Sequence, residues 1–179
     1  TIVTGAPLKN LGELIINVPD IKIDRWVCQG GYVSDNMIPE EYPKLEKFKG
    51  LDWCNTYNFN GAPKYALLLI ESENIKQKYF VSKNICHQME YTKDKLVKDN
   101  NNDIIKNILS VYLEKKDSKK LHDLVALITA IEPDIITWID GTFVRGEKGQ
   151  WGSIKGNDKL AGKIDEDKFW SIFMNRNSF

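Results

Sequence analysis

Cysteine is scarce in this sequence, and its spacing does not suit metal binding. The chain of 179 residues has three cysteines, Cys28, Cys54 and Cys86, and no two of them form a C-x-x-C pair. An odd number of widely spaced cysteines argues against a disulfide framework and against a cysteine-based zinc site. We therefore expect reduced, buried thiols in a cytoplasmic protein.

The sequence also lacks a long apolar segment. No apolar run approaches the roughly 18 residues of a membrane-spanning helix, and the first residues, Thr-Ile-Val-Thr-Gly, contain neither a basic stretch nor a cleavage signal. These residues are typical of a β-strand that has already begun before Thr1. We expect no membrane association, and we expect Thr1 to Thr4 to pair with a strand from upstream residues or from a second chain.

An excess of either charge is absent as well. Lys+Arg and Asp+Glu both total 25, so no overall field favours nucleic acid or an anionic membrane, and a ligand must be recognised by a local site. The composition, 42% hydrophobic and 28% charged, is ordinary for a globular protein. We expect residues 1–179 to form a single domain.

The residues that are present predict alternating strands and helices. Residues 1–4 are β-formers, apolar residues then recur at helical spacing from Leu8 to Val18 before Pro19, and residues 23–28 form another apolar strand. A strand, a helix and a second strand in succession predict a βαβ unit with parallel strands. The fold class expected is therefore α/β.

The rest of the chain continues this alternation with less regular stretches between. The predicted elements are a loop or short helical pieces over 34–59, a helix over 63–72, a strand over 79–85, a helix whose apolar stripe is Ile104, Ile105, Ile108 and Val111, a helix over 121–131, short hairpin strands over 135–139, 143–145 and 150–155, and a helix over 169–174. The run 99–103 of Asp and Asn is predicted to be a loop or a helix start.

Several segments, in order, resemble the inosine-uridine nucleoside hydrolase family. Residues 4–11 resemble its T-G-P-L-T-N-L turn, 26–31 its V-x-M-G-G strand end, 57–66 its E-F-N-x-x-x-D-P-E-A-A segment, and 81–88 its V-x-L-D-x-T-H-Q segment. Residues 121–126, with His122-Asp123 before an apolar helix and Glu132-Pro133 after it, resemble its H-D-P-x-A helix start. This last segment is the most specific.

The resemblance implies a fold and a chemistry. It implies the C-terminal part of a three-layer α/β domain with a mainly parallel sheet, whose N-terminal strands are missing here. It implies an N-ribohydrolase that cleaves the N-glycosidic bond of nucleosides with Ca²⁺ assistance. His122 would then be the general acid, Asp123 and the carbonyl of Thr4 metal ligands, and Asn58 a contact of the sugar.

The sequence departs from the family at positions that matter for activity. Thr56 stands where the family has a glutamate, Gln29 replaces a methionine and Asn84 an aspartate, and the aspartate-rich loop D-x-D-x-x-x-D-D is absent. Calcium requires six to eight oxygen ligands, so two are too few. We expect the remaining ligands to come from an N-terminal segment or from a second chain, such as another copy in a homo-oligomer, and we expect the chain alone to hydrolyse nucleosides poorly.

Other interpretations of the same residues stay open. The family fold without activity, as a ligand-binding or protein-interaction module, is the alternative to an enzyme. A His-Asp pair at a helix start can simply cap the helix, His87 is expected to fix a turn, and Asn58 can be a turn residue. Trp53, Tyr57 and Phe59 are expected in the core more than stacked on a base. The absence of G-x-G-x-x-G and P-loop motifs disfavours an unrelated nucleotide-binding domain.

Overall fold

The first elements form the predicted parallel βαβ unit. The computed structural model describes residues 1–98 and 103–174. It begins with β1 (Ile2–Thr4), α1 (Lys9–Asn17) and β2 (Ile23–Gln29). Strands β1 and β2 pair in parallel, with Thr4 opposite Cys28. Helix α1 ends two residues before Pro19 because proline cannot continue the hydrogen-bonded turn and restricts the residue before it.

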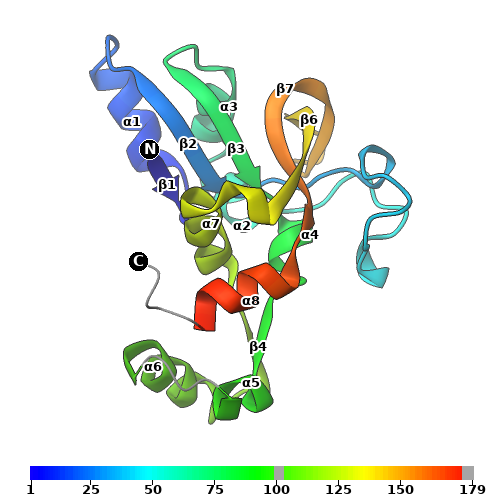
Figure 1. Ribbon diagram of the computed structural model, residues 1–179. Coiled ribbons are helices and arrows are strands. Elements are labelled where there is room, and N and C mark those ends of the chain that lie inside the picture. The colour runs from blue at the N-terminus through cyan, green and yellow to red at the C-terminus, as the bar shows by residue number, and fades with distance from the viewer. Residues whose placement is uncertain (99–102, 175–179) are drawn as a thin grey trace.

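The main sheet has five strands in the order β1-β2-β3-β7-β6 (Figure 1). Its other members are β3 (Ile75–Val81), β6 (Ile136–Arg145) and β7 (Trp151–Ile164). All neighbouring pairs are parallel except β6 and β7, which form an antiparallel hairpin. The prediction of a mainly parallel sheet is confirmed, and β1 lies at one edge of it.

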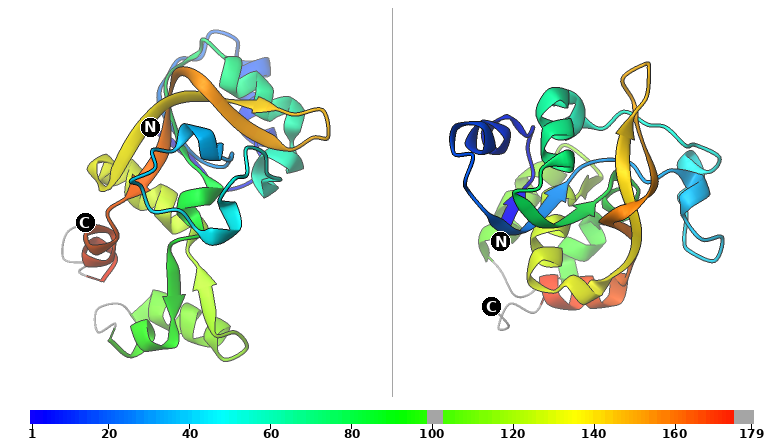
Figure 2. Two further views of the ribbon diagram at one scale, coloured as in Figure 1. Left: turned by 90° about the vertical axis from the view of Figure 1, so that its right-hand side faces the viewer. Right: turned by 90° about the horizontal axis from the view of Figure 1, so that it is seen from above.

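Helices cover both faces of this sheet and make three layers (Figure 2). Helices α1 and α3 (Pro63–Glu71) pack on one face, and α7 (His122–Ile131) and α8 (Glu166–Met174) on the other. Successive side chains of a strand point to opposite faces. Trp26 and Cys28 of β2 therefore pack in the core under α1 and α3, and Val27 packs in the core under α7 and α8. The three-layer α/β architecture is confirmed.

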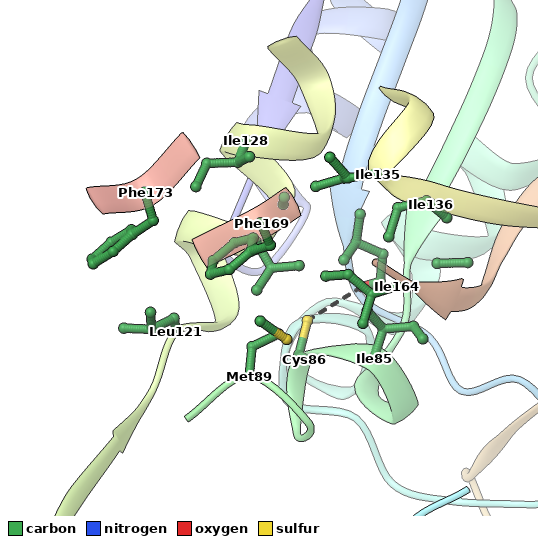
Figure 3. Close-up of a cluster of buried hydrophobic side chains, with 14 of the residues drawn as sticks. Ile85, Cys86, Met89, Leu121, Ile128, Ile135, Ile136, Ile164, Phe169 and Phe173 are labelled. Atoms are coloured by element: carbon green, nitrogen blue, oxygen red, sulfur yellow. Dashed lines mark hydrogen bonds between the residues drawn. The ribbon is translucent and has the colours of Figure 1, made fainter. Parts of the chain in front are cut away.

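The core under α7 and α8 ties the C-terminal end of the chain to the sheet. Figure 3 shows Phe169 and Phe173 of α8 beside Ile128 of α7 and Ile164 of β7. Phe169 is fully buried. Burial of such side chains is the main favourable contribution to folding, at roughly 25 cal/mol per Å² of apolar surface. The buried side chains of α7 and α8 therefore cover this face of the sheet.

The strand predicted over 79–85 is shifted. β3 starts earlier, at Ile75, and ends at Val81, and residues 83–86 form the short helix α4 (Lys83–Cys86). The polar run Lys76-Gln77-Lys78 hides the strand's first half from a hydrophobicity pattern, but its backbone still pairs with β2 from Ile23 onward. The backbone ladder, not side-chain burial, decides this start.

The predicted short hairpin strands are in fact two long ones. β6 runs continuously through Gly141, and β7 runs through Gly156, with a register shift between Gly141 and Thr142. A Cβ added to Gly156 would lie 2.9 Å from the carbonyl carbon of Gly141. These glycines let two strongly bent strands approach closely, whereas in the sequence they resemble turns.

A smaller part of the chain projects from the main sheet at the bottom of Figure 1. Its elements are β4 (Glu90–Thr92), α5 (Lys93–Lys98), α6 (Asp103–Leu113) and β5 (Ser118–Lys120), with β4 and β5 antiparallel. The expected α6 stripe is wrong at Ile108 and Val111, which are exposed, and Leu109 and Leu113 are buried instead. Residues 99–102 of the Asp/Asn run lie outside the described residues.

The stretch between β2 and α3 consists of loops and short turns, as predicted. It contains η1 (Asp35–Met37), η2 (Glu46–Phe48) and α2 (Tyr57–Gly61). A further short helix, η3 (Pro133–Ile135), precedes β6.

Of the helices in the described part of the chain, none combines the length and apolarity needed to cross a bilayer. The three cysteines are free, with Cys28 and Cys86 buried and Cys54 partly exposed.

Candidate active site

A cleft of about 640 Å³ lies where the parallel strands end. Residues 5–7 follow β1, Gln29 and Gly30 end β2, and Lys83 follows β3; all of them line the cleft. Open α/β sheets place their ligands at the carboxyl ends of the strands. The other lining residues are Thr56, Tyr57, Asn58, His87, His122 and Asp123.

Asn58 forms one wall of this cleft from the first turn of α2. Its side chain is 4% exposed, and its amide nitrogen donates to the carbonyl oxygen of Gln29 at 2.8 Å and to Gln29 Oε1 at 2.5 Å. The amide group is therefore held against the end of β2. Asn58 is thus an anchored residue of the cleft and not a loose turn residue.

His122 and Asp123 enter the cleft from the start of α7. The cap position belongs to Leu121, and no side chain caps the helix, so capping does not explain the pair. Asp123 is exposed, and a Cβ added to Gly5 would lie 2.7 Å from its Oδ1. The carboxylate therefore lies directly against the turn that follows β1. A side chain at Gly5 would displace it.

His87 stacks on His122 across the cleft wall. Their ring centroids are 5.2 Å apart with planes inclined by 22°, and the Lys47 ammonium donates to His87 Nδ1 at 2.8 Å. Burial, followed by the nearby Lys47, His122 and Lys83, lowers the pKa of His87 to about 3. His87 is therefore neutral at physiological pH, and its Nδ1 accepts a hydrogen bond from the Lys47 ammonium.

The same surroundings act on His122. Burial lowers the pKa of His122, Asp123 opposes this shift, and Lys119 and Lys120 add to it. Within the described part of the chain, no group accepts from or donates to its buried Nε2. Most buried polar atoms in folded proteins have a hydrogen-bond partner, because burial without one is costly. A ring nitrogen without a partner in a cleft wall is therefore a candidate proton-transfer atom.

Thr4 is the proposed site residue that the structure does not bring into the cleft lining. Its neighbour Gly5 lines the cleft, while the Thr4 hydroxyl accepts a hydrogen bond of 2.9 Å from Trp26 Nε1 and faces β2. The sequence-derived set of Asn58, His122 and Asp123 does share one cleft.

The described residues do not fit a calcium site of their own. Asp123 is the one carboxylate that lines the cleft, and among residues 1–98 and 103–174 no three His, Cys, Asp or Glu side chains gather closely enough to hold a metal ion. Calcium needs six to eight oxygens, several of them carboxylates. One acidic side chain beside several cations does not meet that need.

Sequence reasoning missed the contribution of Lys83. Its ammonium donates to the carbonyl oxygen of Asn55 at 2.9 Å and approaches Cys54 Sγ at 3.3 Å, so it is held beside Thr56. The Thr56 residue is 4% exposed, and its hydroxyl lacks a partner among the described residues. The position of Lys83 just after β3 was the available signal, because that is where this fold class places ligands.

Two other expectations for this region need correction. Phe59 is fully buried, as predicted, but Trp53 and Tyr57 are 44% and 85% exposed and do not belong to the core. Tyr57 lines the cleft, where its ring is free to stack on a planar ligand.

Asn84 has a structural role. Its Oδ1 accepts from the Val33 amide at 2.9 Å, and its Nδ2 donates to the Val33 carbonyl oxygen at 3.0 Å.

Comparison with solved structures identifies the architecture around this cleft. The chain superimposes on a plant nucleoside hydrolase with a TM-score of 0.71 at 19% identity, over 97% of this chain and 60% of that one. The fold is that of the nucleoside hydrolases. A purine-preferring ribonucleoside hydrolase from Gardnerella vaginalis gives 0.68 at 18% identity, over 96% and 58% of the two chains.

A third comparison agrees. An inosine-uridine preferring nucleoside hydrolase from Bacillus anthracis gives a TM-score of 0.64 at 14% identity, over 94% of this chain and 57% of that one. The chain thus spans less than two thirds of the length of these enzymes. No protein-family model and no curated protein matches the sequence. The likeness therefore establishes the fold alone, with strongly diverged residues upon it.

Proposed function

We propose that this chain carries the base- and sugar-binding part of an N-ribohydrolase site. The observation that supports the proposal is the meeting of Asn58, His122 and Asp123 in one cleft at the strand ends of a nucleoside hydrolase fold. Asn58 holds the sugar, Tyr57 offers a face to the base, and His122 donates a proton.

Each role follows from the chemistry of the bond that breaks. As the bond between ribose C1′ and the base nitrogen breaks, its electron pair leaves with the base, and the imidazolium form of His122, which burial makes a stronger acid by lowering its pKa, donates a proton to that nitrogen. Positive charge develops on the ribose and is stabilised by the Asp123 carboxylate. A water molecule forms the new bond to C1′ and releases its proton to the solvent in the cleft.

Calcium assistance is a separate part of the proposal. Asp123 and the carbonyl of Thr4 are the ligands that we propose from this chain, and further oxygens would have to come from outside the described residues. Bound there, the ion would hold the ribose hydroxyls and lower the pKa of a water molecule. The roles of Asn58 and His122 do not depend on it.

A second candidate function is a ligand-binding module without catalysis. The observation that favours it is the single carboxylate of the cleft, which leaves the attacking water without an evident base or metal among the described residues. Such a module would bind ribosyl compounds through Asn58 and Tyr57 and release them unchanged.

Binding and ribose release, measured separately, test both candidates. We expect inosine or uridine to bind to the purified protein in calorimetry, and Asn58→Ala to weaken that binding. Ribose release, measured as reducing sugar with calcium present, would support the enzyme when His122→Ala abolishes it and leaves binding intact. Binding without release supports the module, and the absence of binding by any nucleoside overturns both.

A further inference from the structure

Part of the cleft lining is positively charged. Lys83 lines the cleft directly, and Lys47 contacts the lining residue His87. Of the lining residues, Asp123 is the one acidic side chain. Glu90, a carboxylate that acts on Lys47, is already paired with the Lys120 ammonium at 2.9 Å. The cations at this part of the lining therefore exceed their partners.

The excess of positive charge contributes to lowered pKa values of neighbouring groups. Partial burial lowers the pKa of Lys47, and the nearby Lys120 and Lys83 lower it further. The pKa of His87 is lowered by burial and then by lysines, which include Lys47 and Lys83. Like charges raise each other's free energy, so an anion placed among them would relieve the repulsion.

Lys83 and Thr56 together offer donors in the right place. An ammonium group has three N–H donors, and two of those of Lys83 are directed to Asn55 and Cys54. Thr56 is a lining residue of the cleft, and its buried hydroxyl lacks a partner among the described residues. One free ammonium donor and one free hydroxyl donor fit two oxygens of a phosphate.

We propose that Lys83 and Thr56 bind the phosphate of a phosphorylated ribosyl compound, so that the ligand of this cleft is a ribosyl phosphate monoester and not a neutral nucleoside. This inference rests on the proposed function, because it assumes that the ribosyl group occupies the same cleft. A nucleoside monophosphate and ribose 5-phosphate share this chemistry and differ in whether a base reaches Tyr57.

Calorimetric titration of the purified protein tests the inference. The ligands are inosine, inosine 5′-monophosphate, ribose 5-phosphate and inorganic phosphate. We expect the monophosphate to bind at least about tenfold more tightly than inosine, a preference that shrinks with added salt because exposed charges are screened. Ribose 5-phosphate binding as tightly as the monophosphate would identify the sugar phosphate as the recognised unit.

Variants separate the phosphate site from the rest of the cleft. Lys83→Met should remove the preference for the monophosphate, so that it binds about as tightly as inosine does to the same variant, Lys83→Arg should retain most of the preference, and Thr56→Val should reduce it a few-fold. Lys155→Met, at an exposed position on β7, is the matched control and should change nothing.

The two proposals fail in different ways. Equal binding of inosine and its monophosphate, or a preference that survives Lys83→Met in a protein with unchanged circular dichroism, overturns the phosphate site and leaves the ribosyl cleft standing. Failure of every ribosyl ligand to bind overturns the proposed function as well. Inorganic phosphate that binds equally to wild type and Lys83→Met also contradicts the inference.

Discussion

Acidification should destabilise this protein through His87. In the folded state the ring accepts a hydrogen bond of 2.8 Å from the Lys47 ammonium, and its pKa is lowered to about 3 from an ordinary value of 6.5. The unfolded chain therefore binds more protons at His87 at pH values between these two. Stability from this source is complete above pH 6.5 and is lost as the pH falls toward 3.

The magnitude follows from proton linkage. Each pH unit within this window changes the free energy of unfolding by at most about 1.4 kcal/mol for one proton. His87 is partly exposed, and solvent screens its interactions, so we expect a loss of about 1–2 kcal/mol between about pH 6.5 and about pH 4.5. Protonation would also set an imidazolium against the Lys47 ammonium.

Urea unfolding of wild type and His87→Gln over this pH range measures the effect. Glutamine has an acceptor for Lys47 but does not titrate, so the difference between the two proteins isolates His87. The chain has two histidines, and His122 stacks on His87, so both proteins are compared in a His122→Gln background that removes its titration. Parallel stability curves for the two proteins would refute the reasoning.

Three further substitutions have definite expected outcomes. Gly5→Ala should weaken ribosyl ligand binding or turnover with little change in urea midpoint, since its Cβ would lie 2.7 Å from Asp123 Oδ1; unchanged ligand binding and turnover would contradict the placement of that carboxylate. Asn58→Ala should lower the free energy of unfolding by about 1–3 kcal/mol, because the Gln29 carbonyl loses its buried donor; urea denaturation measures it. Phe169→Ala should cost about 3–5 kcal/mol through the cavity it leaves, visible as a lower melting temperature, and a loss below about 1 kcal/mol would show that α8 packs loosely.

The sequence predicted best those elements that are continuously apolar or have apolar residues at helical spacing. Helix α1 has its apolar residues at helical spacing, and β2 and α7 are apolar segments that end before Gly30 and Pro133, so the type and approximate bounds of these elements could be predicted. β3 was predicted four residues too late, and β6 and β7 were predicted too short, because part of these strands is polar or contains glycine and pairing of the backbone decides their extent. The short strands β4 and β5 contribute a single fully buried apolar residue, Tyr91, which forms no pattern that could reveal them.

The site was predictable to the extent that it followed a motif. Asn58, His122 and Asp123 lie in one cleft although they are far apart in sequence, because their elements end at the same edge of the sheet. Lys47 lies outside the matched segments, and Lys83, within residues 81–88, stands where the family pattern has leucine. A lysine in sequence does not indicate where its ammonium points. Their closeness to His87 is a property of the tertiary structure alone.

Thr56 and Lys83 together change what the cleft can bind. Where the resemblance leads one to expect a glutamate, Thr56 places a neutral hydroxyl, and beside it the Lys83 ammonium is fixed by the Asn55 carbonyl. The cleft therefore has one anionic group, Asp123, and one ammonium group, Lys83, in its lining. In the proposed reaction Asp123 stabilises the cationic ribose that develops during bond cleavage, and Lys83 binds the phosphate. A neutral nucleoside would use only Asp123, and Lys83 would then remain without an anionic partner.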